Sequence, residues 1–280
     1  MNSLIDVSCF ELIKQVDDHI FELFTYHTPP ENQDLGYVDR RSESIDITLH
    51  RSNIDLSISQ SLTELSSTKE TSSTGFVCWK SAVYFTDWLL SDERCPFYLI
   101  FRNKSSLKVL ELGTGVAGIC VSLLGPLVGT YTATDQKHIL KLLKQNFETN
   151  AGTQKYTSTT LKRPPTKHKN PPRIEFIEFD WEDLDNAMYN CETLGLDPPD
   201  LVIACDTIYN DYLIPHFISA FTILLRQGTG ILITLQLRQP DTLESFVRQV
   251  VDASLNMYYI PFDMLSEELT AGFVVYYITE

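Results

Sequence analysis

The second half of the chain alternates between short apolar segments and stretches with helical spacing. The apolar segments predict strands at 108–112, 130–134, 174–179, 201–205 and 230–235. The stretches between them predict helices at 116–124, 137–149, 212–226 and 241–254. Two more strands, at 256–260 and 272–278, are expected to pair with each other at the end of the chain. Repeated strand–helix units are typical of a mostly parallel sheet with helices on both faces.

The first 73 residues have a different pattern, which predicts a small α+β extension. The expected elements are a helix over 4–27, strands at 44–50 and 53–59, and a mobile Ser/Thr-rich loop at 61–74. A further helix is expected at 79–90, near the start of the next region. We therefore divide the chain into an extension, residues 1–73, and a main domain, residues 74–280.

Composition limits the class of protein. The 280 residues are 43% hydrophobic, enough for one large domain with an extension. No apolar run reaches the ~18 residues that cross a bilayer, and no basic segment precedes an apolar stretch at the N-terminus. The six cysteines and six histidines are scattered without metal-ligand spacing, so we expect no metal site. Reduced thiols fit a cytoplasmic protein, which we take to be a monomer without membrane contact.

The chain carries 22 basic and 37 acidic residues, a net charge of -15. Such a surface repels phosphates, so we expect no direct nucleic-acid specificity, and it favours a basic protein partner. Many soluble proteins are acidic for solubility alone, and composition by itself favours that simpler explanation. The insertion at 151–172 is an exception, with four lysines, one arginine, four prolines and no acid. We expect a flexible solvated loop there, and a grip on the ribosome or RNA is the less favoured interpretation.

The strongest local signal is Glu111-Leu112-Gly113-Thr114-Gly115-Val116-Ala117-Gly118, which follows a predicted strand and begins a predicted helix. Its glycines permit a tight turn and close approach of a cofactor to the backbone. NAD, FAD and S-adenosylmethionine sites all use such a turn, so the glycines do not choose between them. Glu111 favours the ammonium group of a methionine moiety, because a carboxylate repels a pyrophosphate.

Acidic residues end the next two predicted strands. Asp135 lies 22 residues beyond Gly113, where an acid can accept the ribose hydroxyls of an adenosine cofactor. The same residue suits the N-cap of the next helix, and the two roles are compatible. Asp180 and Trp181 follow the third strand and are candidates to contact the adenine, although a Trp at a strand end is more often part of the core.

The fourth predicted strand ends in Asp206-Thr207-Ile208-Tyr209. Ligands bind at the carboxyl ends of strands in open α/β sheets. Methyl transfer from a sulfonium needs a neutral amine, and a free lysine has a pKa near ~10.4, so the site must orient the amine and help to remove its proton. We interpret Asp206 as the group that attracts the incoming ammonium and Tyr209 as the group that aligns it. The alternative is that Asp206 only begins the turn to the next helix.

These segments together resemble the seven-strand (class I) methyltransferases that modify lysines of non-histone proteins. The resemblance rests on Glu111-Leu112-Gly113-Thr114-Gly115, Asp135, Asp180-Trp181, Asp206-x-x-Tyr209 and Thr74-Gly75-Phe76-Val77-Cys78-Trp79. Within that family, Gln33-Asp34-Leu35-Gly36, Ser59-Gln60-Ser61-Leu62 and Ile208-Tyr209-Asn210 are most similar to the fungal members that methylate ribosomal lysines. The similar segments run from about residue 20 to the C-terminus.

The resemblance implies a Rossmann-like sheet, the cofactor S-adenosyl-L-methionine and a protein substrate. It implies the following cofactor contacts: Trp79 beside the cofactor, Gly113, Thr114 and Gly115 at the methionine end, Asp135 at the ribose, Trp181 at the adenine and the backbone of Cys205. The implied reaction is monomethylation of one lysine in the stalk protein (protein one) of the large (60S) ribosomal subunit. The short stretch after Asp55 and the insertion at 151–172 depart from the family and bear on which protein docks.

Other interpretations predict different sequence features. A lysine methyltransferase of another cytosolic protein, such as a translation factor or a chaperone, would keep the same cofactor residues. An NAD-dependent oxidoreductase would need a second half with parallel crossovers, whereas this chain is expected to end in an antiparallel pair. A non-catalytic binding module would have lost cofactor residues, yet Gly113, Gly115 and Asp135 are present. An amino methyltransferase of nucleic acids would carry N-P-P-Y or D-P-P-Y at position 206.

Overall fold

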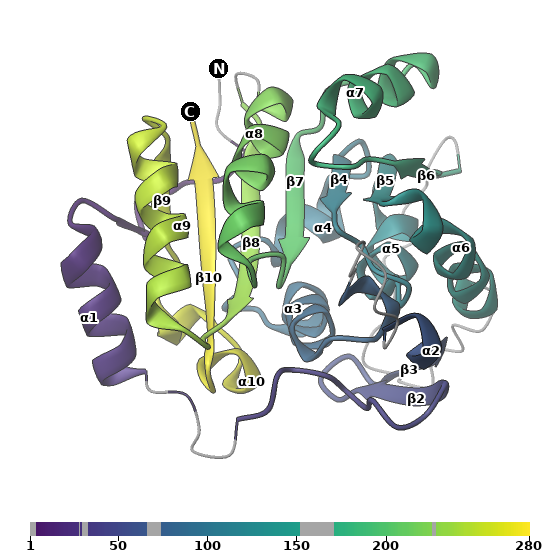
Figure 1. Ribbon diagram of the computed structural model, residues 1–280, viewed down its shortest axis with the longest axis horizontal. Helices are drawn as coiled ribbons and strands as arrows, with labels where there is room; N and C mark the ends of the chain where they lie inside the picture. Colours follow the sequence, from purple (N-terminus) through teal and green to yellow (C-terminus); the bar gives the residue numbers. More distant parts are fainter. Residues whose placement is uncertain (1–3, 28, 30–32, 66–73, 152–170, 226–227) are drawn as a thin grey trace.

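The centre of the molecule is a twisted sheet (Figure 1), seen in a computed structural model that describes residues 4–27, 29, 33–65, 74–151, 171–225 and 228–280. Within these ranges the sheet has eight strands in the order β1-β9-β10-β8-β7-β4-β5-β6. The parallel strands are β4 (Lys108–Leu112), β5 (Thr130–Asp135), β6 (Arg173–Glu178), β7 (Leu201–Cys205) and β8 (Gly230–Gln236). The antiparallel strands are β10 (Phe273–Thr279), β9 (Asn256–Tyr259) and β1 (Glu11–Leu12). The prediction of a Rossmann-like seven-strand sheet is confirmed, and β1 adds an edge to it.

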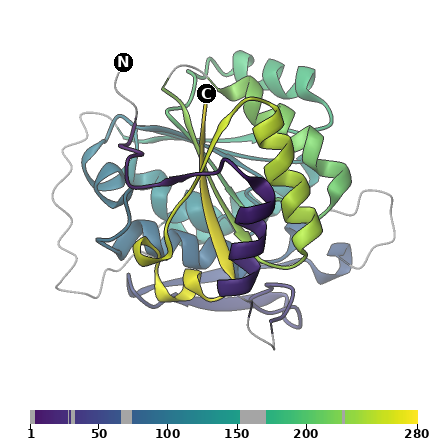
Figure 2. The ribbon, with the colours of Figure 1, turned by 90° about the vertical axis from the view of Figure 1, so that its left-hand side faces the viewer.

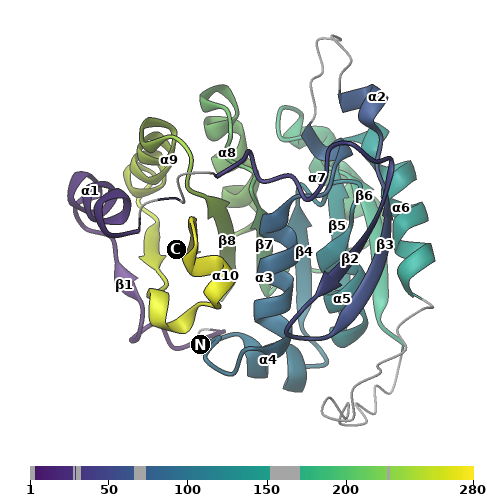
Figure 3. The same cartoon turned by 90° about the horizontal axis from the view of Figure 1, so that it is seen from below.

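Helices cover both faces of the sheet (Figures 2 and 3). One face carries α1 (Val16–Tyr26), α7 (Leu184–Thr193), α8 (Ile214–Leu224) and α9 (Pro240–Asp252). The other carries α3 (Lys80–Ser91), α4 (Tyr98–Asn103), α5 (Ile119–Leu124), α6 (Lys137–Ala151) and α10 (Glu267–Thr270). Successive residues of β7 enter opposite cores, because strand side chains alternate: Val202 packs on the first face and Ile203 on the second.

A two-stranded hairpin, β2 (Ser44–Leu49) and β3 (Ile54–Ser59), packs on the outside of α3 and α5 (Figure 3). Two asparagines of α6 pair with the free edge of β3. Asn146 Oδ1 accepts from the Ser59 backbone N–H at 2.8 Å while its Nδ2 donates to the Ser59 carbonyl at 2.8 Å. Asn150 makes the same pair of bonds to Ser57, at 3.0 and 2.9 Å. The side-chain amides thus replace the backbone of a neighbouring strand.

Several predicted elements differ from the structure for tertiary reasons. The helix expected over 4–27 is wrong in its first half, because Glu11–Leu12 pairs with β9 as β1 and Phe10 is buried against Phe97 and Tyr277. The helix expected from residue 116 starts at Ile119, since Gly118 has a left-handed φ of 55°. The loop predicted at 61–74 contains α2 (Leu62–Leu65), and residues 66–73 lie outside the described ranges.

The structure does not test two further sequence-based expectations, the nature of the insertion at 151–172 and the division of the chain at residue 73. Most of the insertion predicted at 151–172 falls outside the described residues, so its nature stays a prediction. The division of the chain at residue 73 also stays a prediction. Two elements of the extension pack on the main domain: β1 pairs with β9, and α1 contacts α9. The helices α4 and α7 were not expected from the sequence.

Asn146→Ala and Asn150→Ala are each expected to destabilise the protein by about 1–3 kcal/mol, because each removes two hydrogen bonds from the β3 backbone. Glu148→Ala, an exposed position on the same helix, is the matched control and is expected to change stability little. Urea unfolding followed by circular dichroism measures the difference. Asparagine variants as stable as the Glu148 control would show that these amides do not hold the hairpin.

Candidate functional site

A cavity of about 280 Å³ opens at the carboxyl ends of the parallel strands β4, β5 and β7. Every site residue expected from the sequence lines it, namely Trp79, Gly113, Thr114, Gly115, Asp135, Trp181, Cys205, Asp206 and Tyr209. The lining also includes the acids Glu111, Asp180 and Glu182, and no lysine, arginine or histidine among its described residues. The fold therefore brings the sequence-predicted residues together in a cavity that favours cations, while their individual roles stay predictions.

The glycine turn after β4 is shaped for close contact. Gly113 has a φ of 70°, and a Cβ built there would lie 3.1 Å from Thr207 Cγ2 and 3.2 Å from Trp181 Cζ2. A larger residue would be strained by its backbone conformation and would crowd both neighbours. The Thr114 N–H donates to the Thr134 carbonyl at 2.9 Å, which fastens the turn to the end of β5. The turn is thus held rigidly with its backbone facing the cavity.

Asp135 lies at the end of β5 and is 8% exposed. Its Oδ2 accepts from the Gly115 N–H and its Oδ1 from the Gln136 N–H, both at 2.7 Å. Burial raises the pKa of this carboxyl to about 6, and the two backbone bonds oppose that rise. A carboxylate has about four acceptor positions, so two remain for ligand hydroxyls. This geometry suits the predicted ribose contact.

Glu111 is 2% exposed and lies on β4 beneath the glycine turn. The Tyr131 hydroxyl donates to its Oε2 at 2.7 Å. Burial nevertheless raises the pKa of Glu111 to about 7, since desolvation outweighs the hydrogen bonds. A ligand ammonium nearby would stabilise the carboxylate form. Glu111 is therefore a buried acid whose charge depends on what the cavity holds.

Two indoles, those of Trp79 and Trp181, line the cavity. Trp181 packs on Phe217, with ring centroids 4.9 Å apart, and its ring edge lies over Gly113. Trp79 Nε1 donates to the Thr74 carbonyl at 3.1 Å, and its ring lies 4.5 Å from that of Tyr37. Asp180 accepts from Gln136 Nε2 at 3.1 Å, which fixes the acid next to Trp181. An acid beside an aromatic face matches the edge and face of an adenine.

Asp206 follows β7 in a left-handed conformation, with a φ of 57°. Its side chain is 2% exposed, and both of its oxygens are occupied by Arg238, with Nη1–Oδ1 at 2.7 Å and Nη2–Oδ2 at 2.5 Å. The carboxylate that we expected to attract the substrate ammonium is therefore already paired with a cation. Sequence reasoning missed Arg238, although its place just beyond the end of the neighbouring strand β8 was a usable signal.

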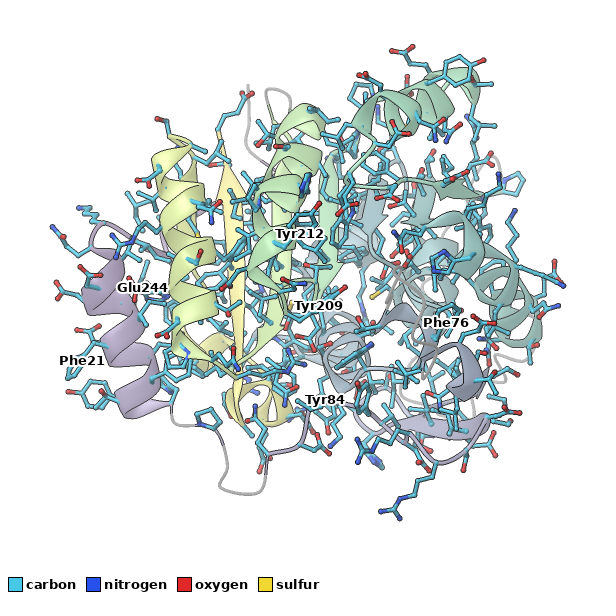
Figure 4. The ribbon with its side chains drawn as sticks, in the orientation of Figure 1. Phe21, Phe76, Tyr84, Tyr209, Tyr212 and Glu244 are labelled. Atoms are coloured by element: carbon cyan, nitrogen blue, oxygen red, sulfur yellow. The ribbon has the colours of Figure 1, made fainter. Side chains whose placement is uncertain are left out.

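Thr207 and Tyr209, near Asp206, also line the cavity. Thr207 Oγ1 is buried and has no hydrogen-bond partner among the described residues. Tyr209 is 39% exposed at the mouth, close to the centre of Figure 4. Partial burial raises the pKa of its phenol, which a side-chain bond with Thr74 opposes. Thr207 was not expected from the sequence, although it lies inside the segment 206–209.

The residues present fit S-adenosyl-L-methionine part by part. Glu111 suits the ammonium, Asp135 the ribose and Trp181 the adenine, while the backbone of Gly113 leaves space that a Cβ would fill. When bound, this cofactor supplies a methyl group activated by a sulfonium. In the described ranges no three His, Cys, Asp or Glu side chains group as metal ligands, and no helix is long and apolar enough to cross a membrane.

The chain is similar to several known proteins. A family model described as lysine methyltransferase matches residues 57–252. The chain is 31% identical to ribosomal lysine N-methyltransferase 5 of Vanderwaltozyma polyspora, covering 93% of this chain and 96% of that protein. It is 29% identical to the protein of the same name from Eremothecium gossypii, with 93% and 95% covered. Among solved structures, Aeropyrum pernix fibrillarin with bound S-adenosyl-L-methionine has a TM-score of 0.43 at 11% identity, covering 88% of this chain and 98% of that one.

The affinity for S-adenosylhomocysteine, the demethylated cofactor, is expected to rise between about pH 5.5 and pH 7.5. Glu111 is protonated below about pH 7, and a bound ammonium favours its carboxylate, so one proton is released on binding. The rise is at most ~10-fold per pH unit for one proton, and it ends near pH ~8, where the ligand amine loses its own proton. Isothermal titration calorimetry across this range measures it.

Glu111→Gln should flatten this dependence and leave only the weaker contribution of Asp135 below about pH 6. The unliganded wild-type protein should conversely lose stability as pH rises through about 7, because the pKa of Glu111 is raised on folding. If the affinity of Glu111→Gln for S-adenosylhomocysteine changed with pH as in the wild-type protein, Glu111 would not interact with the ligand ammonium.

Proposed function

Because this chain belongs to the lysine methyltransferase family, we propose that it monomethylates a lysine of the stalk protein (protein one) of the large ribosomal subunit. The family match confirms the enzyme class, the fold and the cofactor expected from the sequence: the chain is an S-adenosylmethionine-dependent protein-lysine methyltransferase. The proposal adds the identity of the substrate and the degree of methylation.

One observation carries the proposed substrate. The likeness to proteins named ribosomal lysine N-methyltransferase 5 extends over nearly the whole chain and not only over the cofactor-binding strands. Substrate choice in such an enzyme depends on surfaces outside the cofactor cradle, because the cradle is shared by enzymes with different substrates. Similarity in the N-terminal residues and at the strand ends therefore supports a shared substrate.

The charge of the cavity suits a lysine side chain. Glu182 lies on the lining and is exposed, and Asp211 is exposed beside the lining residue Tyr212. These acids attract an ammonium toward the mouth, where the field of several like charges adds up. Tyr209 then aligns the amine. In this proposal Asp206 acts with Arg238 as a neutral pair rather than as a free carboxylate.

Tyr209→Phe is expected to lower kcat roughly 10-fold, the effect of losing one hydrogen bond of about 1.4 kcal/mol that aligns the amine. The affinity for S-adenosylhomocysteine should stay the same, because the hydroxyl lies at the mouth. Tyr189→Phe, at an exposed tyrosine of α7 that does not line the cavity, is the matched control. Steady-state kinetics with a saturating cofactor separate the two variants, and equal kcat values for both would remove Tyr209 from the site.

Ribosomes from fungal cells that lack this enzyme, incubated with the purified protein and radiolabelled S-adenosylmethionine, should acquire label on a single large-subunit protein. Asp135→Ala should abolish the label through loss of the ribose contact, whereas Asp252→Ala, an exposed acid at the end of α9, should not. Mass spectrometry should find one added methyl group on one lysine of the stalk protein. Label on a non-ribosomal protein instead, with cofactor binding intact, would overturn the proposed substrate.

A further inference from the structure

A second network lies beside the cofactor cradle and joins residues 33–38, here named the arm, to neighbouring elements. The Asp34 carbonyl accepts from Gln236 Nε2 at 3.0 Å, and the Leu35 carbonyl accepts from Arg238 Nη2 at 2.8 Å. The Gly36 carbonyl accepts from the Lys80 N–H at 2.8 Å. The arm is therefore held through its backbone, on one side by the end of β8 and on the other by the start of α3.

Arg238 is the centre of this network. Besides the two bonds to Asp206 and the bond to Leu35, its Nη2 donates to Gln236 Oε1 at 2.8 Å. Its guanidinium carbon lies 5.4 Å from the ring centroid of Trp79, within cation–π distance. The side chain is only 19% exposed. The planar guanidinium thus contacts the end of β7, the end of β8, the arm and an indole that lines the cavity. A lysine ammonium could not make all of these contacts, because it has fewer donors and they are not held in a fixed fork.

The arm is shaped for this contact. Gly36 has a φ of 91°, and a Cβ built there would lie 2.1 Å from Gln236 Oε1 and 3.1 Å from Arg238 Nη2. A residue larger than glycine would be strained and would push the arm away from both side chains. The close approach of the arm to the end of β8 therefore depends on the missing side chain of Gly36 and on the hydrogen bonds of Arg238.

We propose that Arg238 is a positioning residue for substrate docking, an inference that rests on the proposed function for its substrate. It fastens the arm against the strand ends and holds Asp206 as a neutral pair, so that the arm and Trp79 form one fixed wall of the route by which the target lysine enters. Leu35, which is 56% exposed, then faces the docking protein from this wall. Loss of Arg238 frees the arm and leaves the Asp206 carboxylate buried without its cation.

The test compares Arg238→Gln, Arg238→Lys and Gly36→Ala with Arg248→Gln. Arg248 is the matched control, because it also pairs with acids of two elements, Asp17 of α1 and Glu244 of α9, and does not line the cavity. Figure 4 shows Glu244 on α9, away from the cavity residue Tyr209. Three quantities are measured: the affinity for S-adenosylhomocysteine, kcat and KM with ribosomes, and the rate of tryptic cleavage after the exposed Arg40 and Arg41 that follow the arm.

Arg238→Gln and Gly36→Ala should raise KM for the ribosomal substrate roughly 10-fold or more, the effect of losing charge-assisted hydrogen bonds, and should keep S-adenosylhomocysteine affinity within about 2-fold. Both should speed cleavage after Arg40 and Arg41. Arg238→Lys should recover part of the KM, because it restores the charge without the planar fork. Arg248→Gln should match the wild-type protein in all three measurements.

Other results would overturn the proposal. A parallel loss of cofactor affinity in both variants would make Arg238 a general structural residue. An unchanged KM with an arm as resistant to trypsin as in the wild type would show that the arm is held without Arg238. If the wild-type protein labels no ribosomal protein, the proposed substrate falls, and cleavage after Arg40 and Arg41 still decides whether Arg238 fastens the arm.

Discussion

Burial of the parallel strands on both faces is the constraint on which the site depends. β7 and β8 are almost wholly apolar, because helices exclude water from either side of them. Polar groups therefore concentrate where these strands end, and the sheet order places the ends of β7, β4 and β5 side by side. The glycine turn, Asp135 and the segment from Asp206 meet for this reason, although up to 93 residues of sequence separate them.

The carboxyl groups of the cavity fall into two electrostatic classes. Glu111 and Asp135 have no cationic partner in the hydrogen bonds that hold them, and burial raises the pKa of each. Their ionisation is therefore costly until a ligand is present, so ligand binding and ionisation are linked. Asp206 is different, because Arg238 matches its charge permanently. The cavity thus keeps its responsive acids at the cofactor end and a neutralised pair toward the arm.

The sequence predicted the central strands well and the N-terminal elements poorly, for reasons that individual residues show. The segment Leu201–Cys205 was expected with the bounds that β7 has, since a continuous apolar run between turns has few alternatives. The helix expected from residue 4 failed because Phe10 is buried by contacts with Phe97 and Tyr277, and local periodicity contains no information about such contacts. That the candidate cofactor residues would lie together could be predicted from their positions at the strand ends. The place of Arg238 just beyond β8 was a signal that it lies near Asp206. The sequence could not show that the two side chains pair, because the direction of a side chain at a strand end depends on its neighbours in the sheet.

The place of β10 has a consequence for a chain that is cut short. This strand, the last along the chain among the described elements, lies between β8 and β9, and its Tyr276 and Tyr277 are almost fully buried. A chain that lacks residues 273–279 would expose two unpaired edges in the interior of the sheet, while β1, the first described strand, pairs with β9. Exposed strand edges promote aggregation and are features that chaperones and proteases act on. A chain that stops before residue 273 would thus be open to aggregation and proteolysis, because β8 and β9 would lack the strand that joins them.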